Sequence, residues 1–138
     1  MAQPKGYLGK RYHFVASHRL HSDAYDEERN REVYGKCNNP HGHGHNYTVE
    51  VVVAGEVDAV TGMVCDLVKL DAFAQKNVLD VFDHQNLNTL RNFVHRVPTT
   101  ENLCVEIHRI FKDGFHEARL EWVRVEETAN NSFEYAGD

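Results

Sequence analysis

One stretch in the first half of the chain limits the possible folds most strongly. It begins with histidines at alternate positions and continues as a predicted β-strand. Residues 41–45 read His-Gly-His-Gly-His, and the clearest strand of the sequence follows at 45–57. In an extended chain, residues two apart point to the same side. His41, His43 and His45 therefore share one face, and the glycines between them let the backbone approach a neighbour closely.

The remaining patterns predict an α+β fold. Residues 7–17 alternate as a strand does, with Tyr12, Phe14 and Ala16 on one side, whereas residues 22–35 are polar and predict a long loop that can include a helical turn. Asp66 is a suitable N-cap for an amphipathic helix, and Pro98 precedes a second helix that Gly114 ends. The predicted elements are, in order, strands at 7–17, 45–57 and 63–65 (the last two joined by a turn at 58–62), helices at 67–80 and 100–112, and strands at 119–127 and 132–136.

This order predicts an antiparallel sheet with both helices on one face. The opposite face must then be polar or covered by a partner, which indicates an oligomer. A length of 138 residues corresponds to a single domain spanning 1–138.

Charge and hydropathy exclude several classes of function. The net charge of −6 argues against a nucleic-acid-binding protein, which normally carries a basic surface. The longest apolar run, residues 51–54, is too short to span a membrane, and the N-terminal residues lack the apolar stretch of a signal peptide. We therefore expect a cytoplasmic protein in which Cys37, Cys65 and Cys104 are thiols.

The clustered histidines predict a catalytic zinc site. His43 and His45 place two imidazoles on one metal ion, and catalytic zinc usually takes three protein ligands and keeps one position open. The third ligand is either His41 or His18, which ends the first strand on its apolar side. We favour His18, because three ligands at alternate positions of a straight strand span about 13 Å.

Cys37 lies six residues before His43, close enough to stand beside the metal. There its thiol would titrate at a lowered pKa and act as a general base. The same cysteine as a fourth ligand would close the site and make it structural, and a third interpretation is an inert buried thiol.

Three acidic positions carry weaker signals. Asp83 precedes His84, a pair that is usually part of a polar loop but can orient an imidazole and raise its basicity. Glu127 ends a strand in phase with its apolar side, so it is either exposed at the strand end or a buried anchor. Glu101 lies in the first turn of the second helix, where a carboxylate interacts favourably with the helix dipole.

Taken together, these segments resemble the 6-pyruvoyl-tetrahydropterin synthase family from end to end and in the family's order. The resemblance implies the T-fold, which is a four-stranded antiparallel sheet with two helices on one face. Three subunits of such a protein close a twelve-stranded barrel, two trimers stack into a homohexamer, and the active sites lie between subunits. The matching segments are 14–20 (FVASHRL), 35–47 (GKCNNPHGHGHNY), 62–64 (GMV), 83–87 (DHQNL), 99–102 (TTEN), Glu127-Thr128 and Asn130-Asn131.

The resemblance also implies roles for individual residues. The implied zinc ligands are His18, His43 and His45, whereas His41 would not be a ligand. Cys37 would be the general base, and Asp83 and His84 would form a relay linked to it.

For the substrate, the resemblance implies 7,8-dihydroneopterin triphosphate. Glu127 would anchor the pterin, because a carboxylate accepts a pair of parallel N–H groups in a fork. Zinc would hold the side-chain hydroxyls while Cys37 takes a carbon-bound proton and triphosphate is eliminated, which is the reaction of a carbon–oxygen lyase in tetrahydrobiopterin biosynthesis. Residues near the pterin would be Thr99, Thr100 and Glu101, and the candidate phosphate contacts are Arg19 and Lys36.

Two other functions stay open at this stage. The related 6-carboxy-tetrahydropterin synthase of queuosine biosynthesis, a carbon–carbon lyase, shares the fold, zinc and substrate but releases acetaldehyde with the triphosphate. Its cysteine typically lies closer to the His-Gly-His pair, whereas five residues separate Cys37 from His43, as in the pyruvoyl enzymes. A non-catalytic zinc- or pterin-binding module is disfavoured because Cys37, Asp83 and His84 are all present.

Overall fold

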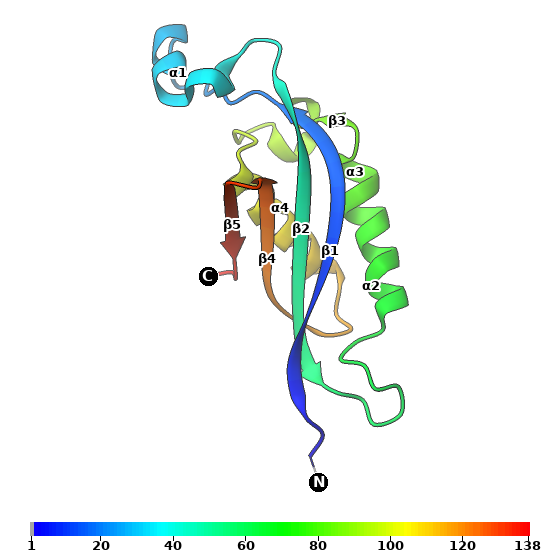
Figure 1. Cartoon of the computed structure of the whole chain (residues 1–138). Helices are drawn as coiled ribbons and strands as arrows, with labels where there is room; N and C mark the ends of the chain where they lie inside the picture. Colours follow the sequence, from blue (N-terminus) through cyan, green and yellow to red (C-terminus); the bar gives the residue numbers. More distant parts are fainter. Residues whose placement is uncertain (1) are drawn as a thin grey trace.

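The framework of the structure, a computed structural model that describes residues 2–138, is a long antiparallel hairpin. Strands β1 (Lys5–His18) and β2 (His43–Glu56) pair over their full length. The ladder runs from Lys5 opposite Glu56 to His18 opposite His43. The lower part of this hairpin extends past the rest of the sheet (Figure 1).

Three further strands complete a five-stranded sheet in the order β3-β1-β2-β4-β5. Strand β4 (Arg119–Thr128) pairs antiparallel with β2, and β5 (Asn131–Tyr135) pairs antiparallel with β4. The two-residue strand β3 (Gln85–Asn86) lies parallel to β1 at its other edge. The four long strands are thus the predicted antiparallel sheet, with β3 added as a short parallel strand.

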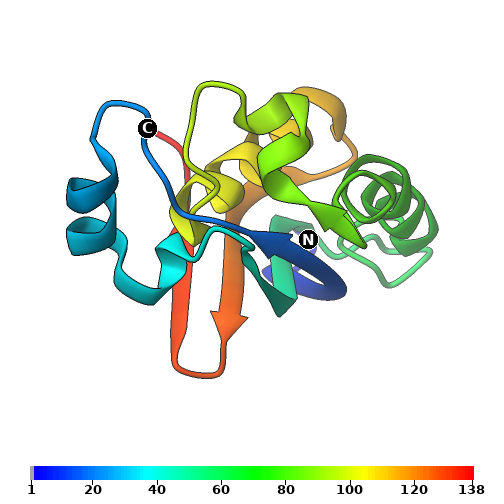
Figure 2. The same ribbon diagram turned by 90° about the horizontal axis from the view of Figure 1, so that it is seen from above.

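Two helical segments cover one face of this sheet (Figures 1 and 2). The first is continuous and consists of α2 (Leu67–Ala74), the π-helical turn η2 (Gln75–Leu79) and α3 (Asp80–Phe82). The second is α4 (Thr100–Gly114). Asp66 caps α2 by accepting from the N–H groups of Val68 and Lys69, and Thr99 caps α4 by accepting from that of Asn102.

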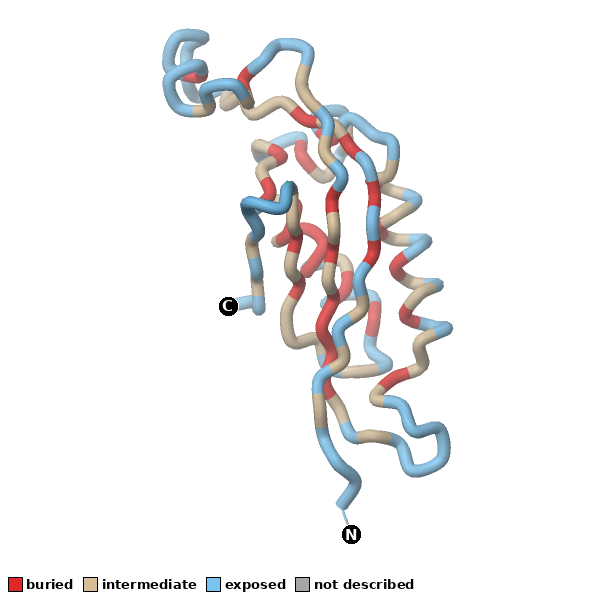
Figure 3. The backbone as a smooth tube through the Cα atoms, viewed as in Figure 1, coloured by how far each residue is buried: buried red, intermediate tan, exposed pale blue. Residues whose placement is uncertain are grey.

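The hydrophobic core lies between these helices and the sheet, where buried residues recur along both (Figure 3). The apolar side chains of β1 predicted to face inward, among them Phe14 and Ala16, are buried. The core also contains Tyr47, Val49, Val51, Leu70, Ala74, Phe82, Leu103, Ile107, Phe111, Val123 and Val125.

The opposite face of the sheet carries charged pairs together with apolar residues such as Val52 and Trp122. Arg11 contacts Glu50 at 3.0 Å, and Arg124 contacts Glu126 at 3.2 Å. In one chain the sheet is open and does not close into a barrel, since β3 and β5 form its two edges. Between residues 2 and 138, no helix combines the length and apolar character needed to cross a membrane.

Short helical segments lie near the upper end of the sheet. Helix α1 (Glu27–Tyr34) and the 3-10 helix η1 (Gly35–Asn38) lie beyond the end of β1 (Figure 1). Two further 3-10 turns, η3 (Leu87–Thr89) and η4 (Arg91–Phe93), follow β3.

Two predictions about local structure were wrong. The segment predicted as a loop contains α1, whose polar side chains give no apolar period although Asp26 caps it by accepting from the N–H of Arg29. Residues 63–65 form no strand, because the turn that Asp58 holds leads directly to the N-cap Asp66. The second helix ends at Gly114, as predicted, and a Cβ there would lie 2.7 Å from the Phe73 ring.

Candidate metal centre

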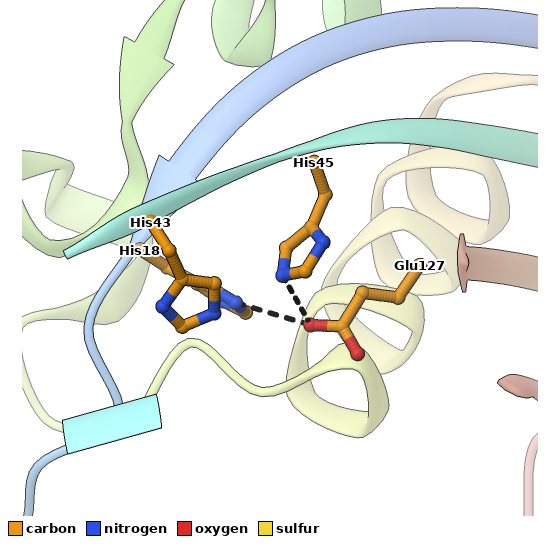
Figure 4. A group of neighbouring side chains, drawn as sticks. All are labelled: His18, His43, His45 and Glu127. Atoms are coloured by element: carbon orange, nitrogen blue, oxygen red, sulfur yellow. Dashed lines mark ion pairs between the residues drawn. The ribbon is translucent and has the colours of Figure 1, made fainter. Parts of the chain in front are cut away.

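Three histidines converge at the upper end of the β1–β2 ladder (Figure 4). His18 is the last residue of β1, His43 is the first residue of β2 opposite it, and His45 lies two positions further on the same face. The ring centroids are 4.6 Å apart for His18 and His43, 5.0 Å for His18 and His45, and 4.8 Å for His43 and His45.

Glu127, one residue before the end of β4, completes the group from the neighbouring strand. Its Oε1 lies 3.1 Å from His18 Nε2 and 3.0 Å from His45 Nε2. One nitrogen or oxygen from each of the four residues lies within 4.8 Å of the others. Ligands of a tetrahedral zinc ion are roughly 3.4 Å apart, given bonds of about 2.0–2.1 Å, so the group is of a size that holds one metal ion.

The hydrogen bonds of His18 fix which nitrogen faces this group. Its Nδ1 lies 2.7 Å from the carbonyl oxygen of Pro98, and the hydroxyl of Tyr47 lies 3.3 Å away. A carbonyl only accepts, so Nδ1 carries a hydrogen and the ring is oriented with Nε2 toward Glu127. Metal-binding histidines are typically oriented by such a bond from their other nitrogen.

The buried nitrogens of the group lack hydrogen-bond partners. Within residues 2–138, His18 Nε2, His43 Nδ1 and His45 Nε2 are buried and make no aligned hydrogen bond. Unpaired buried polar atoms are costly and therefore uncommon. Three buried imidazole nitrogens that converge on one carboxylate, without aligned hydrogen bonds among them, suit a bound cation, and a donor set of three imidazoles suits zinc.

The electrostatics of the group also favour metal binding. Burial lowers the pKa values of His43 and His45, which keeps both imidazoles neutral. Contact with His18, and then the amide of Asn131 at 2.9 Å, lowers the pKa of Glu127 to about 2. Neutral imidazoles beside an ionised carboxylate are the protonation states that a metal ion requires.

Cys37 and His41 lie outside this group. Cys37 is half-buried in η1, and burial together with the charge of Glu127 raises the pKa of its thiol. His41 is exposed, and its backbone N–H donates to the side chain of Asn39 at 3.1 Å. The potential fourth protein ligand in the structure is therefore Glu127 rather than Cys37.

Asp83 and His84 lie on the other side of β1, at the edge that faces away from β2. Asp83 Oδ1 accepts from the N–H of Val15 at 2.9 Å, which is the main cause of the lowered pKa of Asp83. His84 Nδ1 lies 3.0 Å from that same oxygen, and its ring is largely exposed. His84 has φ of +60°, a conformation that non-glycine residues seldom adopt and that occurs at functional sites.

The structure does not bring this pair to Cys37 within one chain. Among residues 2–138, no hydrogen bond or ion pair links Cys37 to Asp83 or His84. The pair lies at the edge of β1 that faces away from β2, whereas His43 and His45 lie on β2 and Glu127 lies on β4 beyond it.

The start of α4 lies beside the histidine group, because the carbonyl of Pro98 accepts a hydrogen bond from His18. Thr99 uses its hydroxyl as the helix cap, Thr100 is buried, and Glu101 is exposed in the first turn. Sequence reasoning missed the contacts of Pro98 and Tyr47 with His18. In the sequence Pro98 indicates only the start of a helix, because no residue type shows which backbone carbonyl accepts a hydrogen bond.

Comparison with known proteins gives matches over almost the whole chain. The family model described as 6-pyruvoyl tetrahydropterin synthase matches residues 7–138. The 6-pyruvoyl tetrahydrobiopterin synthase of Poecilia reticulata is 43% identical over 138 residues (99% of this chain and 94% of the relative), and the Homo sapiens protein of that name is 42% identical over 132 residues (95% and 91%). The solved structure of Caenorhabditis elegans 6-pyruvoyl tetrahydropterin synthase superposes with a TM-score of 0.95 at 39% identity, covering 100% of this chain and 99% of that one.

Proposed function

This chain belongs to the 6-pyruvoyl tetrahydropterin synthase family, and on that basis we propose that it is a zinc-dependent lyase. The proposed reaction converts 7,8-dihydroneopterin triphosphate to 6-pyruvoyl-tetrahydropterin with elimination of triphosphate. We further propose that residues 1–138 form one such domain and that the enzyme is cytoplasmic.

One observation carries the proposed metal dependence. One buried nitrogen from each of His18, His43 and His45 lacks an aligned hydrogen-bond partner, and the three histidines converge on Glu127 within the size of a single metal site. His18, His43 and His45 would hold the zinc ion. When bound, zinc would supply the positive charge that stabilises an oxyanion formed as a carbon-bound proton leaves.

Cys37 is the proposed general base. Its thiol must lose its proton before it can accept one from carbon, and burial together with the nearby Glu127 charge opposes that loss. Binding of a cation by the histidines and of a pterin by Glu127 would offset this charge. The pair of Asp83 and His84 is the proposed relay for the proton.

Glu127 is the proposed anchor of the pterin, which requires its carboxylate to leave the histidines when zinc and substrate bind. Asn131 holds its Oε2 at 2.9 Å and would keep the side chain oriented. A carboxylate held in this way can accept two parallel N–H groups of the pterin ring. Thr99, Thr100 and Glu101 are the proposed neighbours of the pterin, since the start of α4 adjoins His18 through Pro98.

Arg19 and Lys36 are the proposed contacts of the triphosphate. Both line a cavity of about 520 Å³ beside η1, which Arg31 also lines. The Nε of Arg19 donates to the Asn38 carbonyl at 3.1 Å, which fixes the guanidinium at the edge of this cavity.

The active enzyme is proposed to be a homohexamer in which each site combines two chains. Asp83 and His84 lie at the β3 edge of the sheet, on the side of β1 that faces away from β2. Closing three open sheets into a twelve-stranded barrel would place this edge next to a neighbouring chain. The relay of one chain would then serve Cys37 of the next.

Product analysis by mass spectrometry tests the proposed reaction most sharply. The purified, zinc-loaded chain is incubated with 7,8-dihydroneopterin triphosphate, and we expect 6-pyruvoyl-tetrahydropterin and inorganic triphosphate. Formation of the 6-carboxy product with acetaldehyde would assign the chain to the related carbon–carbon lyase. No turnover, with pterin binding retained, would identify a non-catalytic module.

A further inference from the structure

We propose that Asn38 is a positioning residue that holds Cys37 in place for proton abstraction, an inference that rests on the proposed function. Asn38 directly follows Cys37 at the end of η1 and is only 5% exposed, whereas the other residues of η1 are exposed or half-buried. No apolar side chain of this short helix reaches the core. Its position must therefore depend on polar contacts.

Those contacts bind both backbone polar groups of Leu20, and we call this arrangement the clamp. The backbone N–H of Leu20 donates to the carbonyl of Cys37 at 2.8 Å, and the side-chain amide of Asn38 donates to the carbonyl of Leu20 at 2.7 Å. A third bond runs from Arg19 Nε to the Asn38 carbonyl at 3.1 Å. Adjacent residues of η1 are thus fixed to the two residues that follow His18, so the thiol is held relative to a candidate metal ligand.

A second buried amide supports the clamp from behind. Asn30 of α1 is fully buried, accepts from the N–H of Ser22 at 2.7 Å, and donates to the carbonyl of Asp26 at 3.0 Å. His21 lies between the two amides, with its Nδ1 3.1 Å from the Asn38 amide. Buried polar networks of this kind are rigid when every member is satisfied and costly when one is removed.

The functional consequence follows from the distance dependence of proton transfer. A base must lie within hydrogen-bond reach of the proton that it removes, and a displacement of about 1 Å can cost up to roughly 10²-fold in rate. Release of the clamp would move the thiol but leave the metal ligands on β1 and β2 in register. The clamp therefore affects turnover without affecting metal binding.

The test compares Asn38→Ala with a matched control, Asn77→Ala. Asn77 makes one similar bond, from its side-chain amide to the carbonyl of Phe73 at 3.0 Å, in the π-helical turn η2 and not in η1. For Asn38→Ala we expect kcat to fall by about 10-fold or more, with KM within about twofold and zinc content unchanged. For the control Asn77→Ala, we expect kcat, KM and zinc content to equal those of the wild type.

Alkylation of Cys37 by iodoacetamide gives a readout that does not depend on turnover. Peptide mass spectrometry distinguishes alkylation of Cys37 from that of Cys65 and Cys104. Alkylation rates measured from pH 6 to pH 10 distinguish a change in the accessibility of the Cys37 thiol from a change in its pKa. We expect Asn38→Ala to speed alkylation of Cys37 at the plateau of this profile, because η1 is released. A smaller change in the same direction is expected for Asn30→Ala, which decides the question if Asn38→Ala does not fold.

Two results would overturn the inference. One is wild-type kcat and wild-type alkylation of Cys37 in a folded Asn38→Ala protein. The other is loss of zinc in proportion to loss of kcat, which would show a general structural role. Failure of the proposed function would give a different result. Full turnover by Cys37→Ala would show that Cys37 is not the general base, whereas the alkylation rates of Cys37 would still show whether the clamp holds it.

Discussion

His18 lies directly opposite His43 at the last rung of the β1–β2 ladder, with the two rings centred 4.6 Å apart. The positions of the histidines in the candidate metal centre are therefore fixed by the strand register and not by a flexible loop. A slip of one residue would turn every side chain of one strand to the other face of the sheet. The buried apolar residues of β1 and β2 prevent such a slip, so the core fixes the geometry of the candidate site.

Glu127 offers the first test, because its carboxylate is either a pterin anchor or a fourth metal ligand. In Glu127→Gln we expect KM for the pterin substrate to rise by about 10²-fold, since an amide cannot accept both hydrogens of the pterin in a charged fork. Zinc content, measured by inductively coupled plasma mass spectrometry, should equal that of the wild type. The control is Glu126→Gln, which removes a neighbouring carboxylate that pairs with Arg124. A loss of zinc in Glu127→Gln would make this residue a ligand and the site a closed one.

Mixing two inactive variants tests whether each site combines two chains. Alone, Cys37→Ala should lose turnover by about 10²-fold or more through loss of the base, and His84→Ala should be impaired by loss of the relay. When the two are dissociated and reassembled together, a sizeable fraction of activity should return, because some sites receive an intact Cys37 from one chain and an intact His84 from the next. Mixed oligomers without activity would contradict the shared site, as would a monomeric active enzyme.

The stability of the metal-free protein should increase with pH between 5.5 and 7.5. Burial holds the folded pKa values of His43 and His45 below their ordinary value of 6.5, so below that pH the unfolded chain binds more protons than the folded one. The pKa of Glu127, lowered from 4.5 to about 2, affects stability only at lower pH. Thermal unfolding after chelation measures this, and replacing both histidines by glutamine should flatten the profile. A Tm that falls with rising pH in this range would show that these imidazoles are charged in the folded state.

The main elements of the fold could be predicted because their signals are local. The alternation of residues 45–57, the cap at Asp66, Pro98 before the second helix and the apolar stripes of the two helices are all signals carried by single elements. Helix α1 was not predictable in this way, since its one buried residue is the polar Asn30. Strand β3 was also missed, because two residues carry no period and pair only through contacts formed in the folded chain.

The candidate site was predictable where strands supply it and not where backbone groups do. Two-residue spacing and the pairing of adjacent strands brought His18, His43 and His45 into one hypothesis. The contact of Glu127 with two of these histidines depends on the pairing of β2 with β4, two segments that lie far apart in the sequence. The carbonyl of Pro98 and the separation of Cys37 from Asp83 depend on the fold as a whole, so neither could be deduced from residue types.

The most direct test of the account is the zinc content of the purified chain and of three variants that each replace one histidine by alanine. The account predicts about one zinc per wild-type chain, loss of that zinc together with turnover in His18→Ala and in His43→Ala, and retention of both in His41→Ala. The control is well matched, since His41 belongs to the same histidine run but lies outside the group. Zinc retained at wild-type affinity by His18→Ala or His43→Ala, or lost from His41→Ala, would contradict it.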